Sequence, residues 1–141
     1  MIFNTLTSWI KDKYWWLRWR TCDKYHVVNT GLEPGYYDKD FQMQCAMMSL
    51  LEDYVEKELP AISCDKYNTP QEAGIAHLDW EIGLQDSPSQ AEAAKEVKQI
   101  YLWWKEHKER IYEDDYELPS VDEELTEMLV RLVRIRRCLW T

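Results

Sequence analysis

The chain of 141 residues has the length of a single domain, and its hydrophobic share of 45% is enough to build a core, which excludes an intrinsically disordered protein. The net charge of −9 is uneven, because residues 1–24 carry five basic and two acidic side chains whereas residues 25–118 hold an excess of twelve negative charges. An acidic body repels phosphate backbones, so we expect no direct binding of nucleic acid.

The first expected helix covers residues 3–21 and contains four of the eight tryptophans. At roughly 100° per residue its apolar side chains divide between two stripes. The aliphatic stripe holds Phe3, Leu6, Ile10 and Leu17. The aromatic stripe, broadly opposite, holds Trp9, Trp15, Trp16 and Trp19, with basic residues that include Arg18 and Arg20 in the gaps.

One apolar stripe is enough to dock a helix on its own domain, so the aromatic stripe has two interpretations. Either this helix is buried between others, or the stripe is an interface with an identical subunit or a different protein, since interface centres favour aromatic residues and arginine. A membrane-surface helix has similar ingredients, but two separate apolar faces argue against it. Residues 1–22 are therefore predicted to form an interface element of one domain that spans residues 1–141.

Two early segments could instead be strands. Aromatic runs also favour strands, which leaves that alternative open for residues 14–20. One short strand is predicted near residues 25–28, before the Gly/Pro turn of GLEPG.

The second and third helices are expected at residues 39–59 and 70–84. In the second, Phe41, Met48 and Val55 follow the helical repeat, with Leu51 or Glu52 at the missing step. TPQE opens the third with an N-cap, a proline and a glutamate in the pattern of a capping box.

The stretch HLDWEIGL (77–84) lies in the second half of the third helix, which is apolar on two sides. Asp79 and Glu81 point in different directions, so they cannot chelate one ion together. His77 and Glu81 are one turn apart and are predicted to form a buried hydrogen bond or ion pair, with a functional pair beside Trp80 as the alternative.

Helices at residues 88–112 and 121–139 complete an all-α bundle of about five helices. SPSQ and SVDE are predicted caps, with Ser120 as the N-cap of the last helix. That helix begins acidic and ends with four arginines, which suits the helix dipole, and we interpret the arginines as a solvated face.

Four carboxylates form the candidate metal site. Glu52 and Glu56 are one turn apart, as are Glu92 and Glu96, and two such faces meeting in a bundle could hold Mg²⁺. The arrangement resembles the all-α nucleotide pyrophosphohydrolases of the MazG kind, whose motif pairs E-x-x-E with E-x-x-D. Asp53-x-x-Glu56 and Glu92-x-x-x-Glu96 depart from it, and exposed acids on amphipathic helices are the alternative.

A ligand-binding pocket is a further hypothesis. Trp80, Trp103 and Trp104, with nearby tyrosines, could stack the base of a nucleotide that the protein sequesters. Beyond the magnesium alternative, no cofactor is expected, because the chain has no Gly-rich phosphate loop and its three histidines lack compact metal-ligand spacing.

The stretches KYHVVNTGLEPGYYDKD, HLDWEIGL and QAEAAKEVKQIYLWW resemble a group of uncharacterised proteins from tailed bacteriophages, over about residues 24–110. The resemblance carries no activity, but it implies a phage origin and action in the cytoplasm of a bacterial host. The scattered cysteines and the lack of a signal peptide agree with that compartment.

The composition and the missing catalytic motifs favour a binding protein over an enzyme. We expect it to inhibit or sequester a bacterial host or defence component, or to self-associate through the N-terminal helix. The alternatives are a magnesium-dependent enzyme acting on nucleotides and a nucleotide sponge.

Overall fold

The computed structural model describes the backbone of residues 2–21, 28–60, 66–113 and 119–139, and within the helices it leaves undescribed the side chains of residues 2–8, 19–21 and 119–121. These ranges are helical or irregular and contain no strand, so the all-α prediction is confirmed. The strand expected near residues 25–28 lies outside them apart from Val28, which is irregular. Residues 14–20 are helical, so the strand alternative there is wrong.

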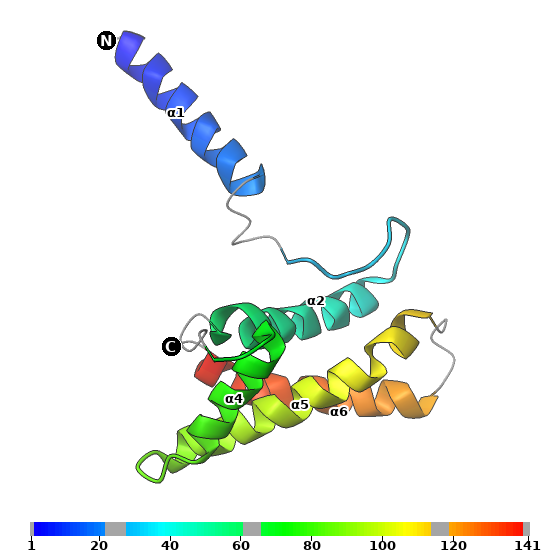
Figure 1. Ribbon diagram of the computed structural model, residues 1–141. Coiled ribbons are helices and arrows are strands. Elements are labelled where there is room, and N and C mark those ends of the chain that lie inside the picture. The colour runs from blue at the N-terminus through cyan, green and yellow to red at the C-terminus, as the bar shows by residue number, and fades with distance from the viewer. Residues whose placement is uncertain (1, 22–27, 61–65, 114–118, 140–141) are drawn as a thin grey trace.

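All five predicted helices are present (Figure 1). Their bounds are α1 Ile2–Thr21, α2 Lys39–Asp53, α4 Pro70–Ile82, α5 Pro88–Glu113 and α6 Pro119–Ile135. A π-helical turn, η1 (Tyr54–Glu58), continues α2, and a 3₁₀ turn, η2 (Arg136–Leu139), continues α6. The continuous helix expected at residues 39–59 therefore exists, with a wider last turn.

Helix α5 is the centre of the bundle. It packs against α4, α6 and α2, while α1 projects away from these four helices (Figure 1). Its inward residues include Val97, Ile100 and Trp104, which are at most 2% exposed. Their spacing of three and four residues places them on one side of the helix, as the sequence predicts.

The predicted helix starts are only partly correct. Thr69 caps α4 by accepting a hydrogen bond from the Glu72 N–H at 3.2 Å, which satisfies a donor that the first turn leaves free. Ser120 is not the N-cap of α6, because that helix already includes Pro119. Proline suits this first helical position, since its missing N–H would have no partner within the helix.

The structure shows which of Leu51 and Glu52 fills the apolar position between Met48 and Val55. Leu51 is fully buried in the core, whereas Glu52 turns toward α5. In η1 the Leu59 N–H donates to the Tyr54 carbonyl at 3.0 Å, a five-residue spacing. This wider turn buries both Tyr54 and Val55.

Helix α4 approaches η1 closely at one glycine. A Cβ atom added to Gly74 would lie 1.9 Å from the Val55 carbonyl oxygen. Pro60, five residues after Val55, has no N–H to offer that carbonyl in the π-helical register. The Gly74 backbone occupies this place, and the close approach buries Ala73 and Leu78 beside it.

The Gly74→Ala substitution is expected to lower the free energy of unfolding by about 3 kcal/mol, because backbone atoms must move to admit the methyl group. This steric cost exceeds the gain of up to about 1 kcal/mol that alanine brings to a helix. Urea unfolding measures the change. Gly35→Ala is the matched control, since its Cβ would meet only the Tyr37 ring, at 3.5 Å. Equal stabilities of the two variants would contradict the packing described.

Candidate functional site

The described part of α1 is an exposed aromatic surface. Every side chain from Trp9 to Arg18 is exposed, including Trp9 at 60% and Trp16 at 52%. Trp15 is 38% exposed and belongs to the same predicted stripe. The side chains of Trp19 and Arg20 are outside the described residues. For Trp9, Trp15 and Trp16 the alternative that the helix is buried between others is wrong. Their exposure is what an interface with another protein would require.

Cations lie over the rings of this stripe. Lys13 Nζ is 6.0 Å from the centre of the Trp9 ring and 5.7 Å from that of Trp16, and the Arg18 guanidinium is 5.2 Å from that of Trp15. Each exposed cation–π contact stabilises this arrangement by only about 0.5–1 kcal/mol. That is enough to favour lysine and arginine side chains that lie along the rings. The result is a surface of rigid aromatic groups bordered by positive charge.

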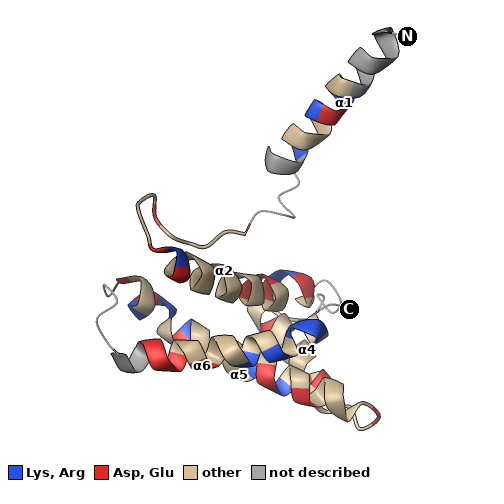
Figure 2. Ribbon diagram, turned by 180° about the vertical axis from the view of Figure 1, so that it is seen from behind, with Lys and Arg blue, Asp and Glu red and all other residues tan. Residues whose placement is uncertain are grey.

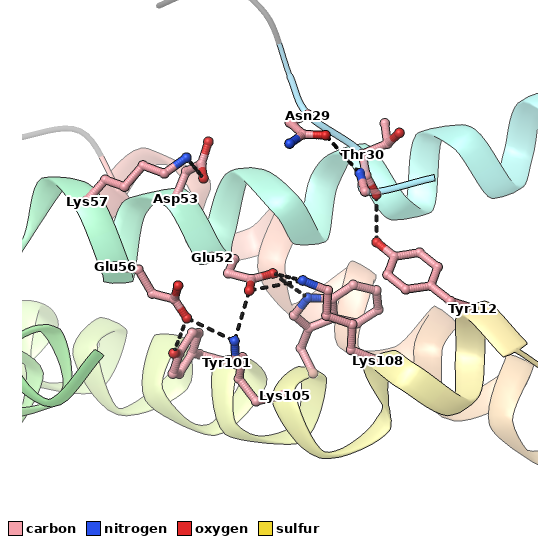
Figure 3. Close-up of polar contacts among 12 residues, drawn as sticks. Asn29, Thr30, Glu52, Asp53, Glu56, Lys57, Tyr101, Lys105, Lys108 and Tyr112 are labelled. Atoms are coloured by element: carbon pink, nitrogen blue, oxygen red, sulfur yellow. Dashed lines mark hydrogen bonds and ion pairs between the residues drawn. The ribbon is translucent and has the colours of Figure 1, made fainter. Parts of the chain in front are cut away.

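A separate site, made of charged side chains, lies between α2–η1 and α5 (Figure 3). Glu52 accepts hydrogen bonds from Lys105 at 2.9 Å, from Lys108 at 2.7 Å and from the Trp104 indole at 3.2 Å. Glu56 accepts from Lys105 at 3.1 Å and from the Tyr101 hydroxyl at 2.6 Å. Two carboxylates and two lysines thus neutralise one another.

The electrostatic consequence is clearest at Glu52. Burial alone would raise the pKa of this carboxyl, but the hydrogen bonds from Lys108 and Lys105 outweigh burial and lower the pKa below its usual range. Burial would likewise lower the pKa of Lys105, and its bonds to Glu52 and Glu56 raise it instead. Both partners are therefore held in their charged forms.

The predicted four-carboxylate magnesium site is wrong. Glu52 and Glu56 face lysines, Glu92 is exposed, and Glu96 accepts a 2.8 Å hydrogen bond from Arg131. In the part of the chain that the structure describes, no three His, Cys, Asp or Glu side chains gather in a metal-binding group. Three of the four carboxylates, those of Glu52, Glu56 and Glu96, pair with lysine or arginine side chains instead.

Arg131 also departs from its predicted role on a solvated face. Besides Glu96 it contacts the Gln99 side-chain oxygen at 2.6 Å, so it ties α6 to α5. The hydrogen bond from Arg131 lowers the pKa of Glu96. Sequence reasoning missed both this contact and the lysine pairs, because the partners are distant in sequence and only the helix packing brings them together.

The buried pair predicted between His77 and Glu81 is present. His77 Nε2 lies 3.6 Å from Glu81 Oε1, and both side chains are about nine-tenths buried. The Gln90 amide donates to the same carboxylate oxygen at 2.9 Å, which gives this buried acid a second partner and links α4 to the start of α5. Burial, aided by the negative charge of Glu81, raises the pKa of Tyr54 to about 12. This pair therefore has a clear structural role.

The three tryptophans proposed for a ligand pocket have different environments. Trp80 is 60% exposed, with its ring centre 5.5 Å from that of His77. Trp103 stacks on His107 at 4.5 Å and donates to Glu124 at 3.3 Å. Trp104 is 1% exposed and belongs to the core, so it cannot stack a ligand, and this part of the prediction is wrong.

Comparisons with protein-family models, curated proteins and solved structures found no match. Among the described residues, no helix is long and apolar enough to cross a membrane. The exposed aromatic stripe of α1 is the candidate functional site because of its own chemistry, which is large exposed rings with cations over them.

Glu52→Gln is expected to lower the free energy of unfolding by about 1–2 kcal/mol, because the half-buried Lys108 loses its carboxylate partner. This loss is smaller than the ~3–5 kcal/mol expected when one partner of a fully buried ion pair is removed, since water still reaches both lysines. Asp53→Asn, which removes the exposed partner of Lys57, is the matched control and should cost under about 0.5 kcal/mol. A loss in the control as large as that in Glu52→Gln would refute the assignment.

The deficit of Glu52→Gln should also depend on pH. A carboxyl whose pKa is lowered by folding contributes its stability above the unfolded pKa of ~4.3 and loses it as the pH falls through the lower folded pKa. The difference between wild type and variant should thus be full at pH 7 and shrink progressively below about pH 4. Denaturant unfolding at a series of pH values tests this. A difference that is unchanged at pH 3 would show that charge is not its cause.

Proposed function

We propose that the protein acts by binding, and that the aromatic stripe of α1 is the surface that contacts its partner. The observation that carries the proposal is the exposure of Trp9, Trp15 and Trp16 on a helix that projects from the bundle (Figure 1). Tryptophan and arginine dominate the energetic centres of protein interfaces. Contiguous exposed apolar surface of this kind is typical of an interaction site, because covering it removes apolar area from water.

The chemistry of the stripe specifies the partner surface. A helix with large rings on one side binds in an apolar groove. Lys13 and Arg18 at the edges of the rings favour a groove with an acidic rim. The bundle supports the same orientation, because acidic residues outnumber basic ones in it, with both kinds visible in Figure 2, and its net negative charge disfavours contact with an acidic partner.

The proposed partner is a bacterial protein. The resemblance to tailed-bacteriophage proteins supports a role inside an infected cell, where a small binding protein inhibits or sequesters a host enzyme or a defence component. Inhibition needs only that the helix occupy a groove that the partner uses.

The test measures the affinity of the full chain for a bacterial protein that co-purifies with it. The double substitution Trp9→Ser and Trp16→Ser removes the two rings that Lys13 bridges, and should raise the dissociation constant at least about 100-fold, since anchor residues each carry ~2 kcal/mol or more. Trp80→Ser, at an equally exposed tryptophan on α4, is the control and should change it less than about threefold.

Circular dichroism would confirm that each variant keeps its helices. Unchanged affinity in the double variant, or a loss confined to Trp80→Ser, would reject α1 as the binding surface. Recovery of nothing but the protein itself from bacterial cells would reject the binding function.

A further inference from the structure

Helix α2 has a second apolar side that faces away from the core. Met43 is 66% and Leu50 is 52% exposed, with the partly buried Met47 between them. These three residues follow the i, i+4, i+7 spacing of one helix face, here called the α2 outer face. The core residues Cys45 and Met48 lie on the other side of the helix.

Helix α1 carries a face with the same spacing. Ile10 and Leu17 of the aliphatic stripe, together with Tyr14 between them, are here called the α1 aliphatic face and are 53%, 56% and 58% exposed. They lie on the side of α1 broadly opposite the aromatic stripe. Two helices with matching i, i+4, i+7 rows can pack side by side with the ridges of one in the grooves of the other.

We infer that the α1 aliphatic face docks on the α2 outer face of a second copy of this chain, so that two copies exchange their α1 helices. Each copy then supplies one α1 face and one α2 face, and a twofold axis relates two identical contacts. Such an arrangement closes on itself and leaves neither face exposed.

The position of α1 supports a second copy as the occupant. Figures 1 and 2 show α1 pointing away from the bundle of its own chain, which leaves the α2 outer face of that chain open. Exchange of an identical element between copies uses contacts that the chain already encodes. A second copy therefore supplies a matching face from the same sequence.

Charge also favours this occupant. Residues 25–118 carry an excess of twelve negative charges, so two bundles repel each other when they meet directly. Lys11, Lys13 and Arg18 outnumber Asp12 on the described part of α1 and make its surface positive. Asp40 and Asp53, the latter also paired with Lys57, lie near the two ends of the α2 outer face. A basic helix between two acidic bundles replaces repulsion with attraction.

The available area is sufficient for a stable dimer. Five of the six side chains per copy are more than half exposed and Met47 is partly buried, so together they would bury on average on the order of 100 Å² each, or about 1,200 Å² for two copies. Specific interfaces begin at about 1,000 Å². The aromatic stripe remains uncovered, so this inference does not depend on the proposed function.

Sedimentation equilibrium of the full chain tests the inference. The wild type should show twice the chain mass of 17.1 kDa. Ile10→Glu with Leu17→Glu, and separately Met43→Glu with Leu50→Glu, should each weaken the dimer at least about 100-fold. Val133→Glu, at an exposed apolar residue of α6, is the control and should leave it unchanged.

Mixing the two double variants distinguishes exchange from other arrangements. Their heterodimer keeps one intact pair, the α1 of one variant on the α2 of the other, so the mixture should form more dimer than either variant alone and less than the wild type. A monomeric wild type would overturn the inference, as would a dimer that survives the α2 substitutions, which indicates pairing of α1 with α1. Trp9→Ser with Trp16→Ser should still form the dimer, which separates this result from a failure of the proposed function.

Discussion

Two lysines of α5 neutralise the carboxylates that α2 and η1 turn into the bundle, and the packing of α2 and η1 against α5 depends on this pairing. Without Lys105 and Lys108, a charged Glu52 that is only 15% exposed would face the apolar side of α5. With them, α2 can lie along α5 and bury Met48 and Leu51 on the same side. Glu52 and Glu56 are thereby committed to folding, whereas the exposed rings of α1 have no such role within the bundle.

Much of the fold could be predicted from the sequence because its signals are local. The Thr69 cap, the apolar repeats and the helix-starting prolines fix five helices to within a few residues. The π-helical turn at Tyr54–Glu58 was not predicted, since the apolar spacing indicated one continuous helix over residues 39–59. The close approach of Gly74 to Val55 left no local signal, because it depends on how α4 crosses η1 in space.

Contacts within one helix could be predicted at the candidate sites, whereas contacts between helices could not. The pair of His77 and Glu81 is one turn apart on one helix, so the spacing alone determines its geometry. The magnesium hypothesis required two helices to present carboxylates to each other, and spacing does not reveal that lysines and Arg131 stand opposite them. The exposure of Trp9 and Trp16 was one of two open alternatives, since a wheel shows which residues share a side but not what covers it.

Helix α1 lies outside the core of its own chain, as the proposed contact surface requires. Hydrogen–deuterium exchange of the full chain, at a dilution where its mass is that of one copy, tests this placement. Amides of residues 2–21 should exchange orders of magnitude faster than those of α5, because exposed helices open locally whereas core helices open only with global unfolding. Protection in α1 equal to that in α5 would place α1 within the bundle and contradict the account.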